Sequence, residues 1–75
     1  MITALRRTFG GTWDGPDREI WGLVERDGQN LKIELLRSSE WVCSVFRDGS
    51  CVAQARACNP VAAVEAALTA VGSLE

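Results

Sequence analysis

The feature that most constrains this chain is a series of four short apolar runs separated by turn-forming residues. The runs are IWGLVER, LKIELLR, WVCSVFR and CVAQARA, and the residues between them are DGQN, SSE and DGS. β-Branched and aromatic residues favour strands, and Asp-Gly at this spacing favours tight hairpin turns. The sequence therefore predicts a four-stranded antiparallel β-meander over residues 20–57.

A helix is predicted to follow the meander over residues 60–72. Asn59 suits the N-cap, Pro60 suits the first helical position, and Gly72 can close the C-terminus. Apolar residues recur at helical spacing and form one stripe, made of Val61, Val64, Leu68 and Val71. We therefore expect a single α+β domain over residues 1–75, in which this helix packs on one face of the sheet.

The turns also predict which strand residues lie opposite each other. A first hairpin tip at Gly28 and Gln29 sets Val24 opposite Ile33. The three-residue loop after the second run sets Ile33 opposite Val45. Because side chains alternate between the two faces of a sheet, each register also assigns every strand residue to one face.

The last hairpin decides where two of the three cysteines lie. A tip in the DGS sequence sets Val45 opposite Val52 and Cys51 opposite Phe46. Cys43 and Cys51 then point to different faces of the sheet, so a disulfide between them would require a register slip. We therefore expect free thiols.

The same register divides the sheet into a helix-facing side and a second side. Gly22 lies on the helix-facing side and would leave room for a close approach there. The second side is predicted to carry an apolar row across all four strands, made of Trp21, Leu36, Val42 and Ala55. A fully solvated face would not normally carry such a row.

Residues 1–19 precede the first clear strand and contain few large apolar groups. Those groups are Ile2, Leu5, Phe9 and Trp13, whose spacing suits a short helix or strand followed by a Gly-rich crossing. If this segment folds back, Phe9 and Trp13 could cover the predicted apolar row. Otherwise the row would be open to a partner.

The Gly-rich stretch TFGGTWDGPD, residues 8–17, does not match a known ligand loop. It has neither the GxxxxGK spacing of a phosphate loop nor the GxGxxG spacing of a dinucleotide loop, and a strand follows it. Its acidic residues also lack the alternate positions of a calcium-binding EF-hand. We therefore interpret it as a turn region that positions Trp13.

The side-chain inventory argues against catalysis and against a metal site. The chain has no His and no Tyr, so its serines lack the usual activating base. Cys58 is the one candidate nucleophile, and a packed thiol at the strand-to-helix junction explains it better. Three cysteines without a CxxC pair do not make a usual zinc site. We expect no catalytic residue, no cofactor and no metal, and therefore a protein that is not an enzyme.

The charge balance argues against nucleic-acid binding. The net charge is −2, so there is no basic excess to bind a phosphate backbone. The meander and helix resemble the later part of double-stranded-RNA-binding domains, where a basic helix N-terminus contacts phosphates, but here that position reads NPVAAVEAAL, without Lys or Arg. Exposed Trp21 and Phe46 could still stack on bases, which leaves single-stranded nucleic acid as an alternative ligand of the sheet face.

A second resemblance concerns the C-terminal half. The segment WVCSVFRDGSCVAQARACNPVAAVEAALTAVG is similar to the hairpin and alanine-rich helix that end many small phage and prophage proteins of unknown function. The resemblance covers less than half of the chain. It implies a small accessory protein of a mobile element that binds one host or phage component.

The sequence thus predicts a non-catalytic protein-binding accessory module. Its candidate partner-binding residues are Trp13, Trp21, Leu36, Val42 and Phe46. The alanine-rich side of the helix is a second candidate surface, and the partner would be an unidentified protein or a second copy. A structural role in an assembly is a further alternative. No run is long and apolar enough for a membrane span, and no signal peptide is recognised, so we expect a cytoplasmic protein.

Overall fold

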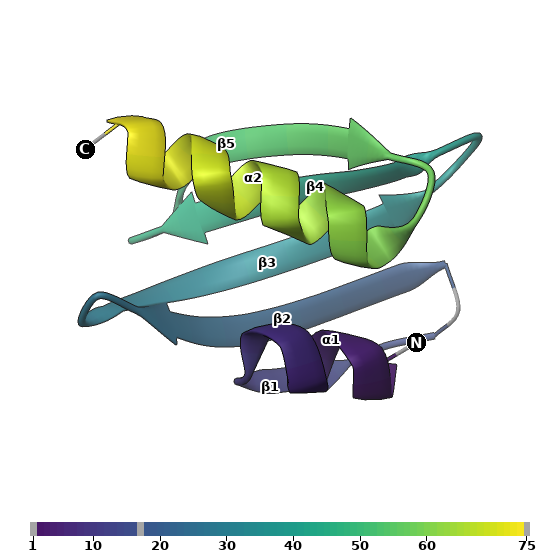
Figure 1. The fold of residues 1–75 in the computed structure, drawn as a ribbon, viewed down its shortest axis with the longest axis horizontal. Coiled ribbons are helices and arrows are strands. Elements are labelled where there is room, and N and C mark those ends of the chain that lie inside the picture. The colour runs from purple at the N-terminus through teal and green to yellow at the C-terminus, as the bar shows by residue number, and fades with distance from the viewer. Residues whose placement is uncertain (1, 17, 75) are drawn as a thin grey trace.

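The computed structural model describes residues 2–16 and 18–74 and shows an antiparallel sheet with helices on one face (Figure 1). Across the described residues the sheet has five strands in the order β1-β2-β3-β4-β5, each antiparallel to its neighbour. In chain order the elements are α1 (Ile2–Phe9), β1 (Thr12–Asp14), β2 (Glu19–Arg26), β3 (Gln29–Arg37), β4 (Trp41–Arg47), β5 (Ser50–Ala57) and α2 (Pro60–Leu74).

The predicted α+β class, the antiparallel sheet and the C-terminal helix are confirmed, but the predicted number of strands is wrong. The N-terminal segment forms α1 and the edge strand β1, which pairs with β2 through Thr12, Trp13 and Asp14. The backbone N–H of Gly10 donates to the Arg6 carbonyl at 2.8 Å and closes the end of α1. The Gly-rich stretch thus contains the connection between α1 and β1 and the whole of β1. Asp17 lies outside the described residues.

The first hairpin turns one residue earlier than the sequence predicts. Asp27 and Gly28 form its tip, with φ values of 53° and 77°. Positive φ at both central residues is the requirement of a type I′ turn, which Asp-Gly satisfies well. Consequently Gly22 lies opposite Ile33, and the predicted pairing of Val24 with Ile33 is wrong by two residues. A two-residue shift changes every partner and leaves each side chain on its predicted face.

Strands β3 and β4 pair as predicted, and the β4–β5 hairpin pairs as predicted only in part. Ile33 lies opposite Val45, as expected. Phe46 also lies opposite Cys51, but a β-bulge follows at Val45 and Phe46. The bulge adds one residue to β5, so that Val45 lies opposite Ala53 and the predicted Val45–Val52 pair is wrong.

The bulge also moves Ala55 to the other side of the sheet. Ala55 lies opposite the buried Cys43 and packs against the core, whereas Arg56 takes the position opposite Val42. The predicted apolar row of four residues therefore does not exist. Cys43 and Cys51 nevertheless lie on different faces, as predicted, and the three cysteines are free.

The hydrophobic core lies between the sheet and the two described helices. It contains Leu5 from α1, Trp13 from β1, the inward-facing strand residues, and one side of α2. Trp13 is only 3% exposed, and its ring covers the backbone of Gly22. The prediction that Phe9 and Trp13 fold over the Trp21 side is wrong, because both pack on the helix-facing side. Gly22 does permit a close approach there, and the group that approaches is the Trp13 ring.

Helix α2 begins as predicted and extends further than predicted. The Asn59 side chain caps it, since its Oδ1 accepts the Ala62 N–H at 2.8 Å. The predicted end at Gly72 is wrong, because the helix continues to Leu74. Gly72 is not among the residues with positive φ, so it does not form the left-handed C-terminal turn that ends many helices. Val71, buried one residue earlier, holds this last part of the helix on the core.

Candidate interaction surface on the open face of the sheet

Both described helices pack on one side of the sheet, and we call the other side the open face (Figure 1). No described part of the chain covers it. Three rows of its side chains cross four or five strands each, and the Glu25–Asn30 pair lies on the same face next to the first hairpin. From β1 toward β5 the rows are Thr12–Leu23–Lys32–Phe46–Cys51, Asp14–Trp21–Glu34–Ser44–Gln54, and Glu19–Leu36–Val42–Arg56, the last beginning at β2.

Three large apolar side chains on this face are about half exposed. They are Trp21 at 47%, Leu23 at 59% and Leu36 at 49%. Val42 and Phe46 lie on the same face and are partly buried. Full burial of one such side chain contributes roughly 1.5–3 kcal/mol, so covering the exposed half of each of these three would be favourable. The open face therefore carries exposed apolar side chains that no described part of the chain covers.

Four of the five predicted partner-binding residues lie on the open face. Trp13 does not, because it lies in the core on the opposite side of β1. Its indole N–H donates to the Gly10 carbonyl at 2.7 Å, and its ring packs near Phe9 with centroids 6.3 Å apart. Leu23 is absent from the predicted set, although strand alternation from Trp21 indicates its position.

Every row on this face mixes apolar with polar side chains. Trp21 lies between Asp14 and Glu34, not opposite Leu36. Leu36 and Val42 are neighbours, and Glu19 lies opposite Leu36 on the other side. The open face is thus a mixed surface, in which each apolar group has a charged or polar neighbour.

An ion pair lies at the centre of this face. The Lys32 Nζ is 3.9 Å from the Glu34 Oε1, and both side chains are exposed. Exposed pairs of this kind contribute only about 0–1 kcal/mol, because water and salt compete for both charges. Further along the Glu34 row, the Gln54 Nε2 donates to the Ser44 Oγ at 3.1 Å.

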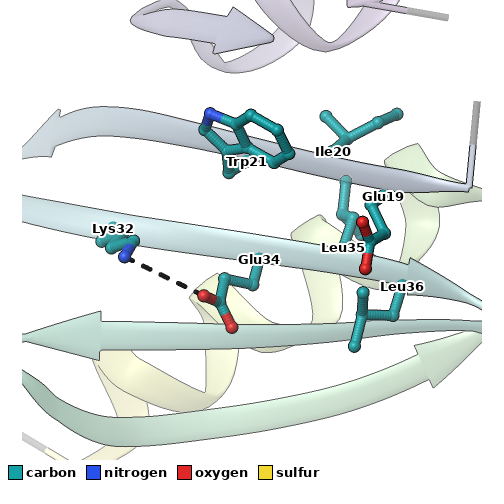
Figure 2. A pocket seen from close by; sticks show the side chains of 7 residues that line it. All are labelled: Glu19, Ile20, Trp21, Lys32, Glu34, Leu35 and Leu36. Carbon is teal, nitrogen blue, oxygen red and sulfur yellow. Dashed lines mark ion pairs between the residues drawn. The ribbon is translucent and has the colours of Figure 1, made fainter. Parts of the chain in front are cut away.

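A shallow depression of about 420 Å³ lies on the β2–β3 half of the open face (Figure 2). It is lined by Glu19, Ile20, Trp21, Lys32, Glu34, Leu35 and Leu36. Figure 2 shows the Trp21 ring over β2, the Lys32–Glu34 pair on β3, and the Glu19 carboxylate near Leu36. The depression therefore combines an aromatic ring, an aliphatic side chain and carboxylates in one place.

The outer side of α2 is the second predicted surface. Ala66 and Thr69 are exposed there, together with the charged Glu65. The Thr69 hydroxyl donates to the Glu65 carbonyl at 2.8 Å, a bond within the helix. This side carries small groups, and the large exposed apolar residues lie on the open face.

The cysteines occupy three different environments. Cys43 is fully buried under α2, whereas Cys51 and Cys58 are exposed, so the interpretation of Cys58 as a packed thiol is wrong. Burial raises the pKa of the Cys43 thiol from 9.0 to about 12, and the nearby Cys51 adds to the rise. Cys43 is therefore a core residue without thiolate chemistry at neutral pH. In the described part of the chain, no group of three His, Cys, Asp or Glu side chains is arranged to hold a metal ion.

We predict that Cys43 resists alkylation in the folded protein. A pKa raised from 9.0 to about 12 lowers the thiolate fraction by about a thousandfold, and burial also blocks the reagent. The double variant Cys51→Ser/Cys58→Ser should react with iodoacetamide only after unfolding in urea, as followed by mass spectrometry. Rapid labelling of this variant in native buffer would contradict the buried position.

The same shift predicts a pH dependence of stability. The pKa of the Cys43 thiol is higher in the folded state than its ordinary value of 9.0, so folding favours the protonated form. Its contribution is present below pH 9.0 and is lost as the pH rises toward about 12. The decline in the free energy of unfolding over this range should be less steep in Cys43→Ala.

Comparison of the chain with protein-family models, with curated proteins and with solved structures gave no match in any of the three searches. Within the described residues, neither helix has the length and apolar character needed to cross a membrane. The chemistry of the open face is therefore the basis for the function proposed below.

Proposed function

We propose that this protein is a small non-catalytic accessory module that binds another protein through the open face of its sheet. One observation carries the proposal: Trp21, Leu23 and Leu36 are each about half exposed on a face that no described element covers. Exposed apolar patches with polar surroundings are typical of protein-binding surfaces. Tryptophan in particular is enriched among the residues that dominate binding energy.

The charges on the open face favour a protein over a nucleic acid. Among its strand residues, all of which the structure describes, the acidic ones are Asp14, Glu19, Glu25 and Glu34, and the basic ones are Lys32 and Arg56. Nucleic-acid surfaces require a basic excess to bind phosphates, and aromatic stacking adds to that attraction. Here both cross-strand neighbours of the exposed Trp21 are acidic, Asp14 and Glu34, and would repel a phosphate backbone.

The wider setting of the proposal comes from the sequence. The C-terminal hairpin and helix resemble the ends of small phage and prophage proteins, so we propose an accessory role for a mobile element in the cytoplasm. In that role the protein would bind one host or phage component. The half-exposed residues on the open face give such a component an apolar surface to cover.

The test is binding by two variants that introduce the same charge on opposite sides of the protein. Trp21→Glu places a carboxylate on the open face, and Ala66→Glu places one on the exposed side of α2. Tagged forms of both variants and of the unchanged protein are used to capture partners from host lysate, with and without nuclease. A captured protein is then purified, and its affinity for all three forms is measured by calorimetry.

We expect Trp21→Glu to weaken binding of the purified partner by at least about tenfold, and Ala66→Glu to leave it unchanged. Thermal unfolding should show that both variants remain folded, because both positions are exposed. The reverse pattern would assign binding to α2. Loss of the captured material on nuclease treatment would contradict the proposal in favour of a nucleic acid. Sedimentation velocity of the three forms shows whether a second copy is the partner.

A further inference from the structure

We propose that the partner inserts an arginine or lysine side chain over the Trp21 ring, between carboxylates of the open face, next to an apolar side chain that contacts Leu36. This inference rests on the proposed function, because it requires the open face to be the binding surface. It goes further by specifying the chemistry of the partner: a basic and apolar protein segment.

The strand register makes three acidic residues the neighbours of Trp21 on the open face. Asp14 on β1 and Glu34 on β3 are the direct cross-strand neighbours of Trp21. Direct neighbours on one face have Cβ atoms about 4.5–5.5 Å apart. Glu19 lies two residues before Trp21 on β2 and points to the same face. Glu19 and Glu34 line the same depression as Trp21, with the Glu19 carboxylate near Leu36 and the Glu34 carboxylate paired with Lys32 (Figure 2).

This combination suits a cation with an apolar neighbour. The face of an indole attracts a guanidinium or ammonium group through its negative electrostatic potential. Carboxylates beside the ring accept charge-assisted hydrogen bonds from the same cation. Leu36 lies on the other side of the depression and offers an apolar contact. Arginine fits best, because its planar group can stack on the ring and donate to a carboxylate at the same time.

The chain's own nearby cation does not neutralise this site. Lys32 lies 3.9 Å from Glu34 in an exposed pair, so solvent competes with the contact and a partner could displace it. In the part of the chain that the structure describes, no cationic group lies within ion-pair distance of Glu19. Asp14 accepts the Gly15 N–H at 2.8 Å and remains a charged neighbour of the ring. The depression thus has an excess of negative charge that a basic partner would complement.

The test uses two synthetic peptides that differ only in charge. Both are acetylated and amidated, with the sequence Leu-Xaa-Leu-Xaa-Leu, where Xaa is arginine in one peptide and its neutral isostere citrulline in the other. Binding is followed by the Trp21 indole N–H signal in nitrogen–proton correlation spectra at low and at high salt. The buried Trp13 and Trp41 provide internal reference signals.

A matched pair of variants isolates the carboxylates. Glu19→Gln/Glu34→Gln removes two negative charges beside Trp21 and keeps the shape of both side chains. Asp27→Asn/Glu65→Gln removes the same net charge from the first hairpin tip and from α2. Asn tolerates the positive φ of residue 27, so this control should preserve the turn.

We expect the arginine peptide to bind about tenfold more tightly than the citrulline peptide at low salt, with the difference shrinking at high salt. The difference should shrink several-fold in Glu19→Gln/Glu34→Gln, which keeps the indole and Asp14, and persist in full in Asp27→Asn/Glu65→Gln. Equal affinities for both peptides would overturn the inference and leave the proposed function standing, because the apolar face would still bind. No change in the Trp21 signal with either peptide would also overturn it. The proposed function is then decided by the Trp21→Glu measurement with the purified partner.

Discussion

Leu5→Ala is expected to lower the free energy of unfolding by about 2–5 kcal/mol. Leu5 is the buried residue of α1, and its side chain is 0% exposed. Through it, α1 joins the same core as Trp13 and the inner side of α2. Removing three carbon atoms from this position leaves a cavity, and a helix of 8 residues has little stability of its own to compensate.

Urea unfolding followed by circular dichroism and tryptophan fluorescence measures this change. Thr3→Ala is the matched control, because Thr3 lies on the same helix and is exposed. We expect that variant to remain within about 0.5 kcal/mol of the unchanged protein. Hydrogen exchange should show the largest loss of protection in α1 and β1. A Leu5→Ala protein as stable as the control would mean that α1 does not belong to the core.

The C-terminal part of the fold could be predicted because its signals are local. Asn59 and Pro60 mark the start of α2 in the sequence, and the observed cap uses Asn59 as expected. The strand runs likewise show regular alternation between turn residues. Such patterns predict whether a segment is a helix or a strand, because the helix cap and the strand alternation each depend on residues only a few positions apart.

The N-terminal part could not be predicted in the same way. The strand β1 has only three residues, Thr12–Asp14, and it exists through its pairing with β2. The indication lay in Gly22, whose place inside a strand predicts that another group approaches closely. The sequence did not show that Trp13 is this group. The Trp13 ring packs on Gly22, nine positions further along the chain, and local sequence patterns do not reveal such a contact.

The sequence predicted four of the five candidate residues on the correct face of the sheet, but it did not predict their cross-strand neighbours. Both DG and GQ are possible tips of the first hairpin, and the choice between them moves every cross-strand partner by two positions. The observed tip replaces Leu36 by Glu34 opposite Trp21. The bulge in β5 then replaces Ala55 by Arg56 opposite Val42. Strand alternation gives the face of each residue, whereas the neighbours on that face depend on turn geometry and on the bulge.

Gly22→Ala is expected to lower the free energy of unfolding by about 1–3 kcal/mol. A Cβ atom at this position would lie 2.5 Å from the Trp13 Cε3 and 2.8 Å from its Cδ2. These are atoms of a buried ring, which is held on one side by the core and at its N–H by the Gly10 carbonyl. The ring can therefore move only if β1 and α1 shift with it.

Gly72→Ala is the control, because it makes the same substitution at a position on α2. The decisive comparison is Gly22→Ala in a Trp13→Ala background. Gly72→Ala places a methyl group in open space on α2 and should stabilise the protein by about 0.5–1 kcal/mol, because alanine favours a helix more than glycine does. In a Trp13→Ala background the clash is absent, so Gly22→Ala should then cost much less than it does alone. Additive effects of the two substitutions would show that the Trp13 ring is not what requires glycine at position 22. Strong coupling would establish that the Trp13–Gly22 contact, on the side of the sheet opposite the open face, holds the N-terminal helix and edge strand in place.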